Sequence, residues 1–541
     1  MVDKRNRRQA PLCVNTAASE DLTEQFRERI TQFVSCPKAL HLKSEIFSKF
    51  VSADTDPADV RRERAISKWL STERDNEATI ERLLLTPEDF HILPWVTFGE
   101  FVSFCQDLIR KVIGDTAPVD ALIGSFSGGA STSRARTESH PAGKYLGIAH
   151  ITPRCRELFE EVILDEMPAW RGLWDQVSII EVPGNVLFTV PKKTDIDRCA
   201  CKEPDINMFV QKGIGNYFRK SLRAIGINLN DQSINRSFAR EGSITGMLST
   251  LDLSSASDSI SSEVVSLLLP ECWFTLLDSV RSPVTIIDGV EHSNQMFSSM
   301  GNGFTFELES LLFYALARTT AYFRGTPGVI SVYGDDIICP SGIAQDLSEV
   351  LSYFGFQVNP DKSFSTGFFR ESCGGHYLHG CDITPFYVKA PIKSLLDIID
   401  VANKLRKWSS QEQPNILGYT IEVDHFVEDT WFWLKSKVPS LLWGGEDTSF
   451  KYRLVSDDIG AYRVSQETKS RSTGDGGYLH WLNATWARTN TPEDGVVTSK
   501  MTTSRERYRL RPVREATVPR LQHYFYKETV VMPSKTDIVS V

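Results

Sequence analysis

Residues 331–340 have the sequence SVYGDDIICP, in which two apolar runs flank Gly334, Asp335 and Asp336. Such a pattern predicts a buried strand, a tight turn and a second buried strand. Neighbouring carboxylates repel each other, and a bound cation offsets that repulsion. The hairpin therefore indicates either a cation site or, as the simpler alternative, a turn in which Asp side chains make local hydrogen bonds.

A second acidic strand end lies upstream, in the stretch TLDLSSASDSIS. Its strand is expected to end at Asp252, followed by a Ser-rich turn and a helix that starts near Asp258 or Ser259. If this strand pairs with the hairpin in one antiparallel sheet, three carboxylates reach one edge, where hard divalent cations bind well. Two such ions about 3.5 to 4 Å apart support nucleotidyl transfer. Since side chains alternate along a strand, we expect Asp335 to be the firmer ligand beside Asp252, with Asp336 contributing from the turn.

Composition narrows the classes of protein further. The 541 residues carry a formal net charge of −9, which argues against a surface that binds nucleic acid throughout. Two stripes rich in Lys and Arg, residues 192–223 and 500–520, alternate with apolar residues. Either stripe could follow a phosphate backbone or be an ordinary solvated face. No apolar run is long enough to span a membrane, and the basic N-terminus lacks the apolar core of a secretory signal, so we expect a cytosolic protein.

The stretch CGGHYLHGC raises the question of a zinc site, with Cys373, His376, His379 and Cys381 as ligands. The four residues are crowded into one short segment instead of forming two separated ligand pairs. We therefore favour a hairpin with core residues over a zinc site.

Six stretches of the chain resemble one family: VPKKTDIDRCACKEP, GINLNDQSIN, TLDLSSASDSIS, SSMGNGFTFELES, VYGDDIICPS and FRESCGGHYLHGCDITPFYVK. Together they are similar to the catalytic (beta) subunits of the RNA-dependent RNA polymerases of single-stranded RNA bacteriophages, the levivirus replicases of the Q-beta type. The resemblance is dense over residues 180–390 and loose outside them. It implies an enzyme that replicates a phage RNA genome by template-directed nucleotidyl transfer.

The resemblance also implies an α+β fold, the right-hand polymerase fold of palm, fingers and thumb, with the catalytic carboxylates on an antiparallel palm sheet. The expected parts follow one another along the chain. They are a helical region with part of the fingers over residues 1–177, the remaining fingers over 178–250, the palm over 251–390, and the thumb and C-terminal region over 391–541.

Carried over residue by residue, the resemblance makes Asp252, Asp335 and Asp336 the ligands of two Mg²⁺ ions, for which Mn²⁺ can substitute. It implies that a basic fingers motif holds the incoming triphosphate, where cations offset the charge that grows on pyrophosphate. That motif consists of Lys192, Lys193 and Arg198. A surface loop is the alternative for these cations.

The remaining implied residues concern the sugar and the leaving group. Asp258 would sense the ribose 2′-hydroxyl, and it could also cap the following helix. A loop would position template and sugar through Ser299, Gly301, Asn302 and Thr305. The wider class of viral RNA polymerases has Asn where this chain has Glu309, which leaves the sugar network less defined. Lys362 is a candidate general acid for the pyrophosphate, with a solvated turn lysine as the alternative.

Two other functions remain possible on the residues alone. A reverse transcriptase shares the palm, but the small polar stretch SSASD favours ribonucleotides. An inactive RNA-binding scaffold would not need all three carboxylates. The resemblance further implies partners in the host bacterial cytoplasm: the RNA template and NTPs, the host elongation factors Tu and Ts, and an OB-fold ribosomal protein.

Overall fold

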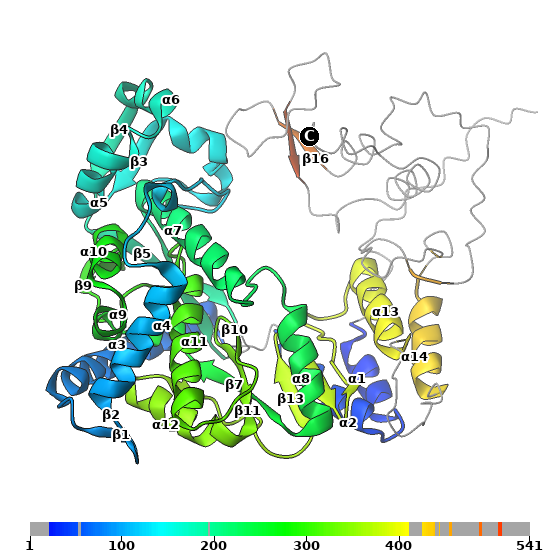
Figure 1. Cartoon of the computed structure of the whole chain (residues 1–541). Coiled ribbons are helices and arrows are strands. Elements are labelled where there is room, and N and C mark those ends of the chain that lie inside the picture. The colour runs from blue at the N-terminus through cyan, green and yellow to red at the C-terminus, as the bar shows by residue number, and fades with distance from the viewer. Residues whose placement is uncertain are drawn as a thin grey trace, which may run out of the picture. The chain divides into compact units, whose positions relative to one another are not determined.

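The computed structural model describes residues 21–51, 56–192, 195–410, 425–438, 443 and 454–456, and the backbone of residues 486–489 and 507–510 (Figure 1). The described residues fall into two compact units. One unit consists of residues 56–384, apart from the two residues omitted above. The other consists of residues 21–51 and the described residues from 385 onward. The carboxylates identified in the sequence all belong to the first unit.

The centre of the first unit is a four-stranded antiparallel sheet with the strand order β10-β11-β7-β12. Its strands are β7 (Leu248–Ser254), β10 (Ser331–Tyr333), β11 (Asp336–Pro340) and β12 (Gln357–Val358). Ile337 and Cys339 on β11 join the main hydrophobic core, whereas Ile338 between them packs with Tyr377 and Ala239 in a separate cluster. The sheet is therefore buried on both faces, because alternate side chains of a strand point to opposite sides.

Helix α11 (Thr305–Phe323) is the main support of this sheet, because it packs against β10 and β11 as well as α4 (Phe98–Ile113) and α7 (Asp205–Ala224) (Figure 1). Most of its side chains are buried, which explains why its sequence is apolar on nearly every side. Helix α4 begins sharply because Thr97 and Glu100 form a reciprocal capping box. On the other face, α8 (Ser233–Thr245) packs against β7 and β11.

A second four-stranded sheet has the order β6-β5-β8-β9. Its strands are β5 (Gly184–Pro191), β6 (Asp197–Lys202), β8 (Val284–Ile287) and β9 (Val290–Ser293). The long helix α3 (Ala58–Leu85) packs against β6. The rest of the first unit comprises the following elements: β1 (His91–Leu93), β2 (Val96–Thr97), β3 (Gly147–Ile151), α5 (Pro153–Leu158), α6 (Pro168–Arg171), β4 (Val177–Glu181), α9 (Ser262–Leu268), α10 (Glu271–Val280), α12 (Ala344–Tyr353), β13 (Phe369–Ser372), β14 (Gly375–Leu378) and β15 (Cys381–Asp382).

The second unit has a hydrophobic core of its own, to which residues from both ends of the described chain contribute. Its elements are α1 (Thr23–Thr31), α2 (Pro37–Glu45), α13 (Leu395–Ser410), α14 (His425–Ser436), and the paired strands β16 (Trp486–Thr489) and β17 (Arg507–Leu510). The basic stripe predicted over residues 500–520 lies outside the described residues, apart from the backbone of β17. None of the described helices is both long enough and apolar enough to cross a membrane.

The α+β fold and the antiparallel sheet that carries the acidic residues are confirmed, since β7 pairs with β11 in the predicted orientation. The predicted start of a helix near Asp258 is wrong. A short 3₁₀ turn occupies Ser257–Ser259, and α9 begins only at Ser262. Its cap is Ser261, whose side chain accepts a hydrogen bond from the backbone N–H of Val264.

Candidate active site

The β10–β11 hairpin turns through Gly334 and Asp335, and Asp336 is the first residue of β11. Gly334 has a φ of +61°, and a Cβ atom there would lie 2.5 Å from Phe306 Cε2 and 2.9 Å from Glu309 Oε1. Only glycine fits this position without strain. The Gly334 N–H donates to Ser310 Oγ at 3.0 Å, so α11 holds the turn in place. We expected Asp336 to be a metal ligand located in the turn, and this location is wrong. Asp335 lies in the turn, whereas Asp336 is already part of β11.

Strand register brings the upstream carboxylate to the hairpin, since Asp252 lies directly opposite Asp336. Directly opposed side chains of antiparallel strands share one face of the sheet. Asn359 Nδ2 donates to Asp252 Oδ2 at 3.1 Å, and Lys362 Nζ lies 3.8 Å from Asp252 Oδ1. Asp252 is thus held by an amide and a cation from the segment that follows β12.

Asp336 has a different set of partners, supplied by the end of β13. Ser372 Oγ donates to its Oδ1 at 3.2 Å, and the Cys373 N–H donates to its Oδ2 at 3.1 Å. Burial and the neighbouring Asp335 raise the pKa of Asp336 to about 7, even though the hydrogen bond from Cys373 favours the charged form. The Asp336 carboxylate is therefore held toward β13.

A cavity of about 360 Å³ opens beside Asp252 and Asp335. Burial and the charge of Asp252 raise the pKa of Asp335. Acidic and basic side chains both line the cavity: Lys68, Lys192, Asp195, Asp197, Arg198, Asp252, Asp258, Asp335 and Lys362. Opposite charges on the walls of one cavity suit a ligand that carries both a metal cation and phosphate groups.

The donor chemistry of this cavity fits a divalent cation, because Asp252 and Asp335 offer hard carboxylate oxygens on its wall. Among the described residues, however, no three His, Cys, Asp or Glu side chains are already arranged around one metal position. Asp336 faces Ser372 and Cys373 instead. The same observation counts against the zinc alternative. His376 Nε2 lies 3.4 Å from Glu371 Oε1 and forms an ion pair when it is protonated.

Asp258 lies in the cavity wall, in the turn before α9. Its pKa is raised to about 6 by burial and by the charge of Glu73, against the opposing effects of Arg198, Lys192 and Lys68. Its carbonyl accepts a hydrogen bond from Asn76 Nδ2 at 2.8 Å. The prediction that Asp258 caps the helix is wrong, which leaves its side chain available to the cavity.

The structure describes the side chains of two of the three cations in the predicted triphosphate motif. Lys192 and Arg198 are exposed side chains on the wall of the cavity, whereas Lys193 lies outside the described residues. Arg198 belongs to β6, next to Asp197, which is buried and paired with Arg61 at 3.1 Å. The two described cations therefore face the cavity that holds Asp252 and Asp335.

The loop before α11 lies next to the cavity, but the predicted positioning residues point elsewhere. Ser299 Oγ accepts from Asn185 Nδ2 at 2.9 Å, and Thr305 Oγ1 donates to the Ser299 carbonyl. Asn302 Oδ1 accepts from the Phe304 N–H. At Gly301 a Cβ atom would lie 2.1 Å from the Cys201 carbonyl, so glycine is needed there. These four residues shape the loop, and the residue of the loop that lines the cavity is Met300.

Three parts of the site were not predicted from the sequence. Helix α3 lines the cavity through Ala65, Lys68, Trp69 and Thr72. Asn359 binds Asp252, and its position directly after β12 was the available signal. Glu309 lies next to the Gly334 turn, where burial and the charge of Asp335 raise its pKa well above the ordinary value. No pattern in the sequence links α3 to the carboxylates, because that contact depends on packing alone.

An α+β fold whose antiparallel sheet presents these carboxylates defines the palm of a right-hand polymerase. The family model described as "RNA replicase, beta-chain" matches residues 16–452, and the chain belongs to that family.

Relatives of the chain carry corresponding names. It is 42% identical over 361 residues to the RNA-directed RNA polymerase beta chain of Escherichia phage MS2, a match that covers 65% of this chain and 64% of the relative. It is 39% identical over 460 residues to the beta chain from Enterobacteria phage GA, covering 82% and 84%. The beta subunit from Escherichia virus Qbeta is 42% identical over 383 residues, covering 68% and 62%. The chain thus spans somewhat less than two thirds of the MS2 and Qbeta relatives.

Proposed function

We propose that this chain is an RNA-dependent RNA polymerase that replicates the genome of a single-stranded RNA phage. One observation carries the proposal: Asp252 and Asp335 share a single cavity with Lys192 and Arg198. Carboxylates and cations facing one another across a cavity of that size suit a nucleoside triphosphate with its metal ions. Family membership and the printed activity of the relatives support the same function.

Different residues of the cavity have different roles in the proposed reaction. Asp252 and Asp335 bind divalent metal ions, which when bound activate the primer hydroxyl and stabilise the leaving pyrophosphate. Asp336, which lies opposite Asp252 in the strand register, would join them if its carboxylate turned away from Ser372 and Cys373. Lys192 and Arg198, together with Lys193, bind the triphosphate, and Asp258 hydrogen-bonds the ribose. We propose Mg²⁺ as the natural ion, with Mn²⁺ as a substitute.

The test is nucleotide incorporation by the Asp335→Asn variant on an RNA template. This change removes a ligand charge without altering side-chain volume, so incorporation should be abolished while RNA binding and folding are retained. The matched control is Asp288→Asn, because Asp288 lies at the exposed β8–β9 turn outside the cavity. Near-normal turnover by Asp335→Asn would refute the proposed function.

We further propose that the chain works in the host bacterial cytoplasm with elongation factors Tu and Ts and an OB-fold ribosomal protein. With a net charge of −9, the chain attracts a polyanionic template weakly at long range, so template choice needs other subunits. Initiation should be measured on cognate and unrelated RNAs with and without these factors. Full solubility and template selectivity of the isolated chain would contradict this part of the proposal.

A further inference from the structure

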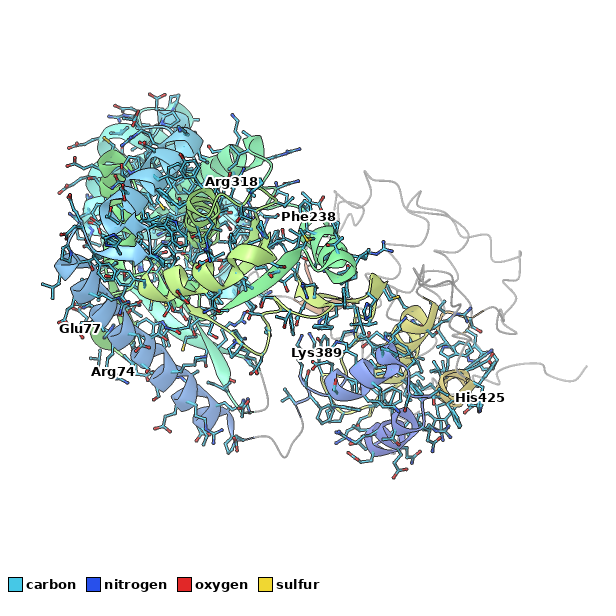
Figure 2. All side chains as sticks on the ribbon, turned by 60° about the horizontal axis from the view of Figure 1, so that its bottom comes forward. Arg74, Glu77, Phe238, Arg318, Lys389 and His425 are labelled. Atoms are coloured by element: carbon cyan, nitrogen blue, oxygen red, sulfur yellow. The ribbon has the colours of Figure 1, made fainter. Side chains whose placement is uncertain are left out.

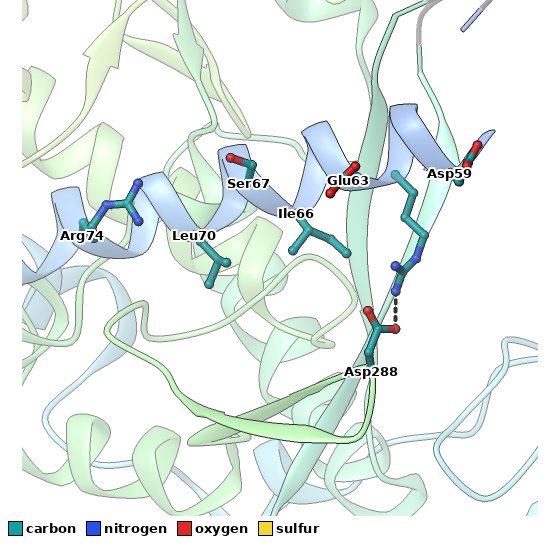
Figure 3. Close-up of a pocket in the computed structure, with 8 residues that line it drawn as sticks. Asp59, Glu63, Ile66, Ser67, Leu70, Arg74 and Asp288 are labelled. Carbon is teal, nitrogen blue, oxygen red and sulfur yellow. Dashed lines mark hydrogen bonds and ion pairs between the residues drawn. The ribbon is translucent and has the colours of Figure 1, made fainter. Parts of the chain in front are cut away.

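Helix α3 separates two differently lined surfaces of the first unit. One side of the helix, with Ala65, Lys68, Trp69 and Thr72, lines the cavity of the carboxylates. The opposite side lines an open groove beside the β8–β9 turn, formed by Asp59, Arg62, Glu63, Ile66, Ser67, Leu70, Arg74 and Asp288 (Figure 3). The spacing of three and four residues on the cavity side is that of one helix face. No residue of α3 lines both the cavity and the groove.

Contacts with three neighbouring segments fix the position of α3. The Glu73 carboxylate accepts hydrogen bonds from the backbone N–H groups of Gln295 and Met296 at 2.7 and 2.8 Å, and His292 Nε2 lies 2.9 Å from it. Asn76 Nδ2 donates to the carbonyl of Asp258. Since Glu73 and Asn76 are buried, these contacts hold the cavity face of α3 in a set register against the turn that carries Asp258.

Lys68 differs from the arginines near the start of α3. Arg61, Arg62 and Arg64 each form an ion pair, with Asp197, Asp288 and Asp56 respectively. Within the part of the chain that the structure describes, Lys68 forms no ion pair within 4 Å. Its side chain is exposed and lines the cavity together with Lys192 and Arg198.

We infer that Lys68 is a binding residue for the phosphates of the incoming nucleotide, placed by α3 opposite the basic residues of the β5–β6 hairpin. This inference rests on the proposed function and adds a residue to the same cavity. Lys68, Lys192 and Arg198 line the same cavity, and the several oxygens of a triphosphate can accept charge-assisted hydrogen bonds from all three at once, which a single carboxylate such as Asp258 cannot do. The flexible lysine stem suits a ligand whose phosphates move as pyrophosphate leaves.

The decisive measurement is the KM for nucleotides in primer extension by the full chain with whatever subunits it requires. Loss of one charge-assisted contact made equally in the ground and transition states should raise the KM for each NTP by about 10-fold in Lys68→Ala, with kcat within about two-fold. The inhibition constant of inorganic tripolyphosphate should rise by a similar factor. Lys68→Arg, which keeps the charge, should restore most of the affinity.

Arg74→Ala is the matched control, since Arg74 lies on the same helix but in the groove and at an exposed position (Figures 2 and 3). It removes the same charge and should leave both constants unchanged. If the Lys68→Ala protein does not fold, Lys68→Met supplies the measurement, because it keeps most of the apolar stem.

The alternative is that Lys68 acts only by favouring the charged form of Asp258. In that case Lys68→Ala should change ribonucleotide over deoxyribonucleotide selection and leave tripolyphosphate inhibition unaltered. That result, or unchanged constants in an active protein, would overturn the inference. Failure of the proposed function would look different, since the wild-type chain would then incorporate no nucleotide. Equilibrium dialysis of tripolyphosphate against the same variants would still show whether Lys68 binds phosphates.

Discussion

Asp252 and Asp336 lie directly opposite each other on adjacent antiparallel strands, yet their carboxylates are held by different segments of the chain. Asn359 and Lys362 bind Asp252, whereas Ser372 and Cys373 bind Asp336. Pairing of β7 with β11 therefore sets the distance between the two strands but leaves each carboxylate a separate orientation. Asp336 would join Asp252 and Asp335 as a ligand of a divalent cation if its carboxylate turned from Ser372 and Cys373 toward the cavity.

The first prediction concerns the stability of the metal-free chain. The pKa of Asp336 is about 7 in the folded state, against 3.8 for the ordinary carboxyl. Between these values the folded chain holds a proton that the unfolded chain has lost, so this group makes the free energy of unfolding fall as pH rises from about 4 to 7. Asp336→Asn should remove that fall and raise stability above pH 7, by an amount on the order of a few kcal/mol.

Thermal unfolding in the presence of a chelator, measured from pH 5 to 8, checks this prediction. The wild-type protein should lose stability over that range more steeply than the Asp336→Asn protein. The control is Asp288→Asn, which changes an exposed carboxylate paired with Arg62. Parallel pH profiles for wild-type and Asp336→Asn would mean that Asp336 is not protonated in the folded chain.

A second prediction separates sugar selection from helix capping. Asp258→Ala should narrow the preference for ribonucleotides over deoxyribonucleotides, because it removes a carboxylate from the cavity wall. It should not cost the stability of a helix cap, since Ser261 is the cap of α9. Ser261→Ala should instead lower the free energy of unfolding by about 1 kcal/mol and leave sugar preference unchanged. Competition between NTP and dNTP, together with chemical denaturation, measures both effects. If Asp258→Ala instead lowered the free energy of unfolding and Ser261→Ala changed the sugar preference, Asp258 would be the cap.

The third prediction compares two glycines with positive φ, in turns that each contain an Asp. Gly289, in the β8–β9 turn, has a φ of +85° and no atom within 4 Å of the place that a Cβ would occupy, so Gly289→Ala should cost about 1 kcal/mol of stability. Gly334→Ala adds a clash with Phe306 and Glu309 and should cost roughly 3 kcal/mol. Denaturant titration measures the difference, and incorporation should fall only in Gly334→Ala, where the clash moves Asp335. Equal losses of stability in the two variants would show that the residues around Gly334 shift to make room for the added methyl group.

Much of this site could be predicted because its residues lie at or near strand ends. Apolar runs mark β7, β10 and β11, with Asp335 in the turn between β10 and β11 and Asp336 as the first residue of β11. The expectation that the upstream strand ends at Asp252 is wrong, since β7 continues to Ser254, and it is the register of β7 against β11 that brings Asp252 to the hairpin. Lys192 directly follows the apolar strand β5, and Arg198 lies at the start of the next strand, β6. The local sequence pattern was sufficient to predict a functional residue wherever that residue lies in, or next to, the strand that positions it.

The rest could not be predicted because it depends on packing between distant segments. Helix α3 reaches the cavity through tertiary contacts, and no local signal distinguishes Lys68 from Arg74 on that helix. The assignment of Asp258 as a cap failed for a local reason. Asp and Ser are both favoured caps, and several of them follow β7, so the sequence alone does not show which one caps the helix. In the structure a 3₁₀ turn occupies Ser257–Ser259, and the cap is Ser261, three residues after Asp258. The orientation of Asp336 depends on Ser372 and Cys373, which are distant from it in the sequence.

The last prediction concerns the group that protonates the leaving pyrophosphate. Lys362 Nζ lies 3.8 Å from Asp252 Oδ1, and its side chain is 52% exposed, so it can either donate a proton or simply balance the charge of Asp252. Lysine can give up a proton, whereas arginine retains its proton in proteins. If Lys362 is the general acid, Lys362→Ala and Lys362→Arg should both lower the single-turnover rate of incorporation by about 10²-fold or more. If only its charge matters, Lys362→Arg should retain most of the wild-type rate while Lys362→Ala loses it. Rapid-quench measurement of one incorporation step distinguishes these outcomes, and a wild-type rate in Lys362→Ala would exclude both roles.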